Sequence, residues 1–220
     1  NEAFAFHRLD YVYLAFDVAQ ERFDQVVDAL TAMNARGWNC TMPHKRRMYE
    51  RADQLSLEAQ LIGAVNTVVQ EQGVLTGYNT DGKGYMAAVR DAGYDILGEK
   101  MTVLGSGGAA ASIIVQAALD GVAEIDLLAR KGKSWDAIRE VAERINERTA
   151  CRVQMYELKD ELQMKKSIGE SRMLLNASSV GMRPGEDACL IPDRTYLHPG
   201  LIVSDVIYNP KETKLLRMAK

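Results

Sequence analysis

The stretch Lys100-Met-Thr-Val-Leu104 runs directly into Gly105-Ser-Gly-Gly-Ala-Ala110, and a run of small residues continues to Leu119. The first segment is typical of a short buried strand, and the last of a helix. Between them the glycines match G-x-G-x-x-[G/A]. Such glycines allow a tight turn that brings the backbone close to a phosphate, and the helix N-terminus offers free N–H groups. Strand, turn and helix together predict a dinucleotide-binding unit that begins near residue 98.

Strand and helix signals alternate through the rest of this half. We expect strands over 124–129, 152–156, 173–176 and 201–206, and a helix over 134–148 whose apolar positions fall on one face. Residues 215–220 also have a helical pattern. Alternating strands and helices predict a doubly wound parallel sheet. The sequence therefore predicts an α/β protein with a Rossmann-type domain over residues 98–220.

The first half gives the signals of a second, smaller α/β unit. Strands are expected over 11–16 and 38–42, helices over 20–36, 45–52, 56–62 and 81–92, and a hairpin whose arms are 66–69 and 74–77. We assign residues 1–81 to a substrate-binding catalytic domain. Residues 82–97 are expected to be a linker helix that joins it to the Rossmann-type domain.

Composition narrows the function classes. The chain has 220 residues, a formal net charge of -3, 47% hydrophobic residues and 26% charged residues, so a disordered or collagen-like chain is excluded. A weakly acidic protein has no general attraction for nucleic acid or anionic membranes, and no apolar run approaches the roughly 20 residues of a spanning helix. The dispersed cysteines (Cys40, Cys151 and Cys189) predict neither a disulfide framework nor a metal site. With no signal peptide recognised, we expect a cytoplasmic protein.

The segment after the second expected strand of the Rossmann-type domain should determine whether the protein prefers NAD or NADP. An acidic residue there would bind the ribose 2′-hydroxyl of NAD, but the sequence reads Ala129-Arg-Lys-Gly-Lys133. Three cations without a carboxylate favour a 2′-phosphate, so NADP is expected and NAD stays open. The alternative is a solvated basic loop that binds nothing.

Polar residues crowd the ends of strands in the first half, where α/β proteins place ligands. Lys45 follows Asn39-Cys-Thr-Met-Pro-His, and Asp81 lies within Gly77-Tyr-Asn-Thr-Asp-Gly-Lys-Gly84. A lysine can serve as a general acid or base, and an aspartate can orient its ammonium group and bind a substrate hydroxyl. The alternative interpretation makes Lys45 a surface lysine and Asp81 a helix cap.

Taken in order, these motifs resemble the shikimate dehydrogenase family, and more closely its quinate/shikimate dehydrogenase branch. The matching patterns are N-x-T-x-P-x-K at 39–45, G-A-V-N-T at 63–67, G-x-N-T-D-G-x-G at 77–84, G-x-G-G-A at 105–109, and the segments 176–182 and 205–213. The resemblance covers nearly the whole chain. Ordered motifs are far more specific than any single one of them.

The resemblance implies an NADP-dependent dehydrogenase that interconverts shikimate and 3-dehydroshikimate, in the pathway to chorismate and the aromatic amino acids. It implies catalytic roles for Lys45 and Asp81. The substrate contacts that it implies are Thr41, Asn66, Asp81, Tyr13, Thr80 and Tyr208. The cofactor contacts are Gly105, Ser106, Gly107, Gly108, Ala109, Arg130, Lys131 and Tyr208. The expected partner is a small-molecule substrate, without nucleic acid or membrane, and a homodimer is retained as an option.

Two departures from the family pattern stand out. The family's amino-terminal strand with its S-x-S segment, and its carboxy-terminal helices, are expected to lie outside these 220 residues. Gly132 stands where the quinate branch usually has an aspartate. Three alternatives stay open: an enzyme acting mainly on quinate with NAD or NADP, a related enzyme such as a methylene-tetrahydrofolate dehydrogenase, and a non-catalytic ligand-binding module. The N-T-D-G-x-G segment argues against the second, and the presence of both Lys45 and Asp81 against the third.

Overall fold

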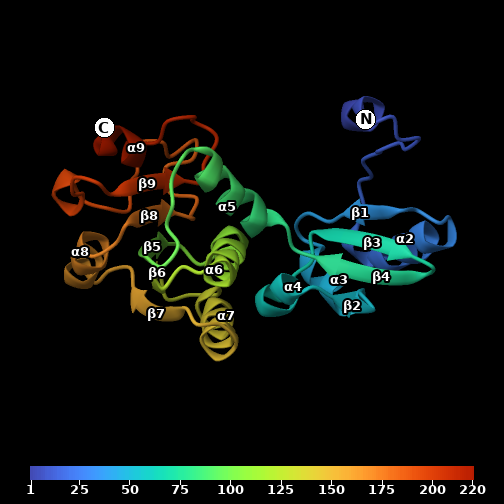
Figure 1. Cartoon of the computed structure of the whole chain (residues 1–220), viewed down its shortest axis with the longest axis horizontal. Helices are drawn as coiled ribbons and strands as arrows, with labels where there is room; N and C mark the ends of the chain where they lie inside the picture. The colour runs from blue at the N-terminus through green and yellow to red at the C-terminus, as the bar shows by residue number, and fades with distance from the viewer.

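The computed structural model describes residues 1–220 as two lobes side by side, each built on its own sheet (Figure 1). The C-terminal lobe has a five-stranded sheet in the order β7-β6-β5-β8-β9, and every neighbouring pair in it is parallel. Its strands are β5 (Lys100–Leu104), β6 (Glu124–Ala129), β7 (Arg152–Glu157), β8 (Met173–Asn176) and β9 (Ile202–Asp205). The predicted doubly wound parallel sheet is confirmed.

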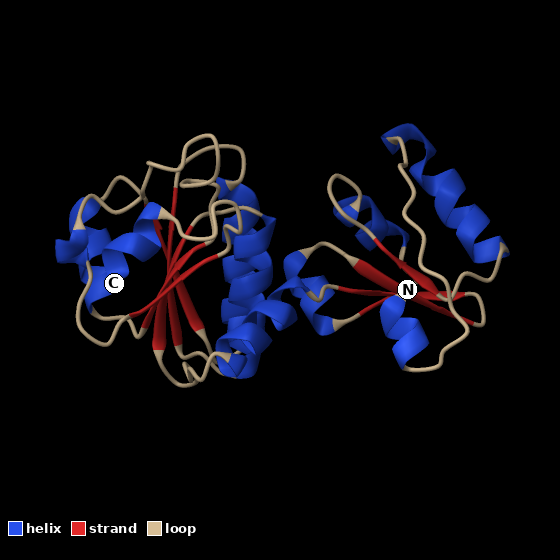
Figure 2. Cartoon of the chain, turned by 90° about the horizontal axis from the view of Figure 1, so that it is seen from above, coloured by secondary structure: helices blue, strands red, loops and turns tan.

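Helices cover both faces of this sheet (Figure 2). They are α5 (Asp81–Asp91), α6 (Gly108–Asp120), α7 (Trp135–Arg148), α8 (Glu161–Gly169) and α9 (Lys214–Ala219), with a 3-10 turn η2 (Arg194–Tyr196). The larger apolar cluster joins α5, α6 and α7 to one face of the sheet, and a smaller cluster joins α8 and α9 to the other. The central strands read as continuous apolar runs because they are covered on both sides.

The N-terminal lobe has a mixed four-stranded sheet in the order β1-β3-β4-β2. Its strands are β1 (Gly37–Asn39), β2 (Gln54–Leu55), β3 (Thr67–Glu71) and β4 (Val74–Tyr78), and its helices are α1 (Glu2–Phe6), η1 (Gln20–Arg22), α2 (Phe23–Ala32), α3 (Lys45–Arg51) and α4 (Leu57–Ile62). The predicted hairpin is β3-β4. Its two turn residues, Gln72 and Gly73, both have positive φ (51° and 81°), as a type I′ turn requires.

The strand expected over residues 11–16 is wrong. This segment forms no strand, and its apolar side chains are exposed, Val12 by 71% and Phe16 by 65%. Aromatic and branched residues fit a pleated surface, but a strand needs a partner for its backbone groups, and residues 1–220 provide none here.

Helix α8 was not predicted, although its sequence carries a start signal. The Asp160 side chain accepts a hydrogen bond from the backbone N–H of Gln163, three residues later. This is the usual N-cap arrangement. None of the helices is both long and apolar enough to cross a membrane.

Candidate active site

Lys45 and Asp81 form an ion pair at the start of two helices. Lys45 is the first residue of α3 and Asp81 the first of α5, and Lys45 Nζ lies 2.6 Å from Asp81 Oδ2. Both side chains remain accessible, with exposed fractions of 28% and 42%. The pair is therefore held by protein contacts while still open to a bound substrate.

Asn66 fixes the orientation of the Asp81 carboxylate. Asn66 is buried just before β3, and its Nδ2 donates to Asp81 Oδ1 at 2.8 Å and to Thr80 Oγ1 at 3.1 Å. Its Oδ1 accepts from the backbone N–H of Thr80 at 3.0 Å. One carboxylate oxygen thus faces Lys45 and the other faces Asn66, which leaves the ion pair little freedom to rotate.

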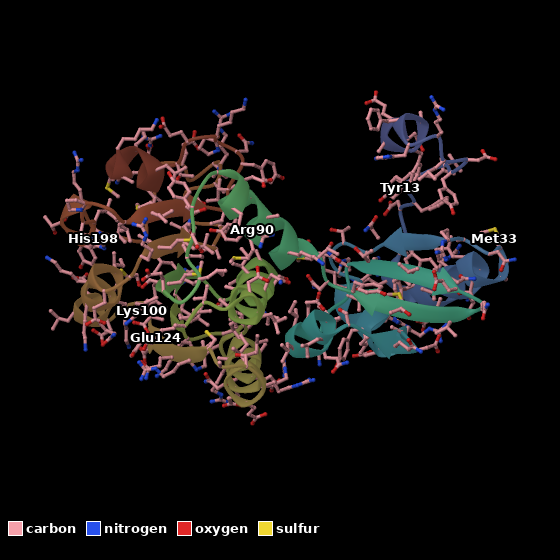
Figure 3. All side chains as sticks on the ribbon, viewed as in Figure 1. Tyr13, Met33, Arg90, Lys100, Glu124 and His198 are labelled. Carbon is pink, nitrogen blue, oxygen red and sulfur yellow. The ribbon has the colours of Figure 1, made fainter.

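The network continues through two residues to which the sequence assigned no role, Thr67 and Asn39. The Thr67 hydroxyl donates to Asn66 Oδ1 at 2.8 Å, and Asn39 Nδ2 donates to Thr67 Oγ1 at 3.1 Å. The hydroxyl of Tyr13 donates to Asn39 Oδ1 at 3.2 Å, from the N-terminal segment, which lies beyond the edge strand β1 (Figure 3). Asn39 belongs to the motif at 39–45 and Thr67 to the motif at 63–67. Their place in these motifs is the sequence signal that could have identified them.

Two predicted substrate contacts lie outside this network. The Thr41 side chain is exposed and makes no hydrogen bond within residues 1–220. Tyr208 follows β9 in the other lobe, and its side chain is 86% exposed with no hydrogen bond. Their assignment to the substrate stays a prediction.

Cys40 lies beneath the same region but is not available for covalent chemistry. It is buried against the N-terminal core, and its backbone N–H donates to the Asn66 carbonyl at 2.8 Å. Burial raises the pKa of the Cys40 thiol to about 11. Because the thiolate is the reactive form, Cys40 is a packing residue.

The glycine-rich turn between β5 and α6 has the geometry of a phosphate site. Gly105 has φ of 133°, and a Cβ there would lie 2.7 Å from the Ala177 carbonyl oxygen, so only glycine fits. Around Gly107 and Gly108 a Cβ would meet nothing within 4 Å. No side chain caps the N-terminus of α6. Open space and uncapped N–H groups together fit the pyrophosphate of a dinucleotide.

The ribose end of this site is polar and basic. Ser106 of the turn shares a hydrogen bond of 2.7 Å with Ser134, which precedes α7. Arg130 is exposed and has no ion pair, whereas Lys131 pairs with Glu157 at the end of β7. Asp126 lies within β6, where its Oδ2 is 2.9 Å from Lys100 Nζ, so it is committed to a structural pair. The three cations and the missing carboxylate at the tip of β6 fit a 2′-phosphate.

Helix α5 joins the two parts of the site. A Cβ on Gly82 would lie 2.1 Å from the Ser112 carbonyl oxygen of α6, so the helices meet at backbone distance. The Ser112 hydroxyl donates to Asn79 Oδ1 at 3.2 Å, and the same oxygen accepts from the Asp81 N–H at 3.3 Å. The carboxylate of the ion pair is therefore positioned against the helix that carries the phosphate turn.

A sizeable cavity lies elsewhere, in the C-terminal lobe. It has a volume of about 780 Å³ and is lined by residues around β9 and α9, such as Arg172, Ile202 and Leu216. None of its lining residues is a predicted site residue. The Lys45–Asp81 pair defines the candidate site, because it brings a possible proton donor and its carboxylate partner together, whereas none of the predicted catalytic residues lines this cavity.

Comparison with known proteins gives one consistent family. The family model for the shikimate dehydrogenase substrate binding domain matches residues 1–68. A shikimate dehydrogenase (NADP(+)) from Listeria monocytogenes is 50% identical over 220 residues, which are 100% of this chain and 76% of that protein. This chain belongs to the shikimate dehydrogenase family.

Other members of the shikimate dehydrogenase family agree with this assignment. A quinate/shikimate dehydrogenase from Escherichia coli is 39% identical over 100% of this chain and 76% of its own length. The crystal structure of shikimate 5-dehydrogenase from Listeria monocytogenes, in complex with shikimate and NAD, superposes with a TM-score of 0.96 at 50% identity, over 99% of this chain and 75% of that one. The predicted family and the predicted α/β fold are confirmed, and relatives of both predicted cofactor types are found.

Proposed function

We propose that this shikimate dehydrogenase homologue catalyses the reversible NADP-dependent oxidation of the ring 3-hydroxyl of shikimate, with Lys45 and Asp81 as the groups that handle the proton. The observation that carries this is the Lys45–Asp81–Asn66 arrangement. The accessible ammonium of Lys45 is held by the Asp81 carboxylate, and that carboxylate is held in turn by the side-chain amide of Asn66. The relative at 50% identity bears the name of this activity and of NADP.

Different parts of the chain bind the substrate and the cofactor in this proposal. Residues 1–81 bind and orient the polyol, residues 98–220 hold the dinucleotide, and helix α5 joins the two. The match of residues 1–68 to the substrate-binding family model supports the first assignment. We place the enzyme in the cytoplasm, which fits three unpaired cysteines.

The nicotinamide supplies the hydride chemistry when it is bound. In the oxidative direction the neutral amine of Lys45 accepts the hydroxyl proton and becomes an ammonium, and in the reductive direction this ammonium donates a proton to the carbonyl oxygen. Asp81 keeps the Lys45 nitrogen in place and offers its accessible edge to a neighbouring hydroxyl of the substrate. The protein's contribution is therefore orientation and the transfer of one proton.

A second candidate substrate is quinate, which lacks the ring double bond and carries an additional hydroxyl. The 39% identical relative is named for both polyols, and the Lys45–Asp81 pair can serve either. A homodimer is the assembly that we propose to test alongside activity, by light scattering of the purified protein.

The test is a spectrophotometric assay with shikimate or quinate, each with NADP and NAD, of a protein in which residues 1–220 are extended by the family's amino-terminal strand and carboxy-terminal helices. We expect the highest kcat/KM for shikimate with NADP. A higher kcat/KM for quinate would move the assignment to the second candidate. No turnover with any of the four combinations, from protein that still binds adenosine 2′,5′-bisphosphate, would overturn the dehydrogenase proposal.

A further inference from the structure

Glu157 lies where it can influence the choice of cofactor. It is the last residue of β7 and pairs in register with Ala129, the last residue of β6. The N–H of Leu158 donates to the Ala129 carbonyl at 2.8 Å. Neighbouring strands lie about 4.8 Å apart, so Glu157 is one strand spacing from the point where the basic loop begins.

The Glu157 carboxylate is already occupied by cations. Its Oε1 pairs with the ammonium of Lys131, and its Oε2 lies 2.9 Å from Lys159 Nζ. The two lysines hold the pKa of Glu157 below its ordinary value, so the carboxylate is charged at neutral pH. Arg130, next in the chain to Lys131, makes no ion pair within residues 1–220.

We infer that Glu157 is a specificity-determining residue that limits the preference for NADP over NAD by holding Lys131. This inference rests on the proposed use of NADP. A 2′-phosphate must compete with Glu157 for Lys131 and also meets the repulsion of its carboxylate. A 2′-hydroxyl meets neither effect. Arg130 is then the cation that binds the 2′-phosphate in the wild-type protein, and Lys131 contributes little.

The experiment measures binding of adenosine 2′,5′-bisphosphate and of 5′-AMP by titration calorimetry, without any reaction. These probes differ only in the 2′-phosphate, so the ratio of their Kd values reports on the ribose end alone. Glu157→Gln keeps the shape and removes the charge. We expect it to lower the Kd of the bisphosphate by about 3- to 10-fold and to leave the Kd of 5′-AMP unchanged. The effect should be smaller at high salt because exposed charges are screened.

A double-mutant cycle separates this role from a structural one. In the wild-type background Arg130→Ala should weaken the bisphosphate by at least about 10-fold and Lys131→Ala by less than about 2-fold. In the Glu157→Gln background Lys131→Ala should cancel the gain. Glu161→Gln is the matched control, because Glu161 begins α8, is exposed and makes no ion pair. It should leave both Kd values unchanged.

The outcomes are distinguishable. An unchanged Kd ratio in Glu157→Gln, while the wild-type protein still favours the bisphosphate, overturns the inference about Glu157 and leaves the proposed NADP use standing. A wild-type protein that binds the bisphosphate no more tightly than 5′-AMP contradicts the proposed NADP use itself. An equal gain from Glu161→Gln would show a long-range charge effect and would also overturn the inference.

Discussion

Lys45 and Asp81 are 36 residues apart in the sequence and 2.6 Å apart in the fold, and the orientation of this pair depends on a third side chain. Asn66 belongs to a motif, but its two-sided hydrogen bonding to Asp81 and Thr80 depends on the hairpin that follows it. Glu157 was missed for a similar reason: it lies near Lys131 only because β6 and β7 pair in parallel.

Replacement of Lys45 should remove the proton transfer while leaving the fold intact. Lys45→Ala should lower kcat by at least about 100-fold with a smaller effect on KM for shikimate, because acid/base catalysis contributes that much or more. Lys45→Arg should not restore activity, since a guanidinium does not release its proton near neutral pH. Steady-state kinetics measures both. Lys166→Ala, an exposed lysine on α8, is the control. Near wild-type kcat in Lys45→Ala would contradict the role.

Gly132 offers a separate test of the ribose end. A Cβ at Gly132 would meet nothing within 4 Å, so an aspartate fits there without displacing other atoms. Gly132→Asp should shift the ratio of kcat/KM values toward NAD by about 10-fold or more, because the carboxylate accepts from a ribose hydroxyl and repels a 2′-phosphate. Gly132→Asn has the same size without the charge and should shift the ratio much less. Equal shifts in the two variants would argue against an electrostatic cause.

At the scale of elements, a predicted strand matches the structure where neighbouring strands and helices pack against it on every side. The strands β5, β6 and β8 have the predicted bounds, because apolar residues between turn signals can only be buried in the middle of a sheet. The segment 11–16 has equally strong strand propensity but no partner strand. Local pattern reports which residues favour a strand, whereas pairing is decided by distant parts of the chain. Short β2 escaped notice because two residues carry no periodic signal.

Helix α5 provides a prediction about packing. Gly82→Ala places a Cβ 2.1 Å from the Ser112 carbonyl oxygen, so α5 must move away from α6. We expect it to lower the free energy of unfolding by about 1–3 kcal/mol, the usual cost of overpacking, and to lower kcat/KM because Asp81 moves with the helix.

Gly84, two residues further along α5, is the matched control for Gly82. A Cβ there meets nothing within 4 Å, so Gly84→Ala should stabilise the helix by about 0.5–1 kcal/mol. Urea denaturation followed by circular dichroism measures both variants. If Gly82→Ala were as stable as Gly84→Ala, the close approach of α5 to α6 would be refuted.

At the scale of the whole molecule, the two lobes are connected by more than the chain between them. Leu61 of α4 is fully buried within the apolar cluster of the C-terminal lobe. Arg144 of α7 donates from Nε to the Leu61 carbonyl at 2.8 Å, and Arg148 donates to Gln60 Oε1 at 3.2 Å. These contacts join the two lobes away from the covalent connection. They could not be predicted from the sequence, because an arginine on an exposed helix face usually meets water.

Removal of the Arg144 contact should loosen the connection between the lobes. Arg144→Ala should broaden the distribution of distances between spin labels on the two lobes and lower kcat several-fold, since alignment of the two ligands contributes strongly to rate. Binding of adenosine 2′,5′-bisphosphate, which contacts one lobe, should not change. Arg139→Ala is the control, because Arg139 pairs only with Asp136 and Glu143 of its own helix. Unchanged distances and kcat in Arg144→Ala would show that other contacts suffice.

The position of α5 also determines how freely the two lobes could be exchanged between related enzymes. Asp81 belongs to the chemistry of the first lobe, while Met86 and Val89 of the same helix belong to the core of the second. A recombination point anywhere within this helix therefore separates the carboxylate that pairs with Lys45 from the packing that places it. Hybrids that inherit residues 79–91 and α6 from one parent keep both intact. A recombination point that exchanges the lobes between related enzymes should therefore lie before Asn79, and not at the visible boundary between the two lobes.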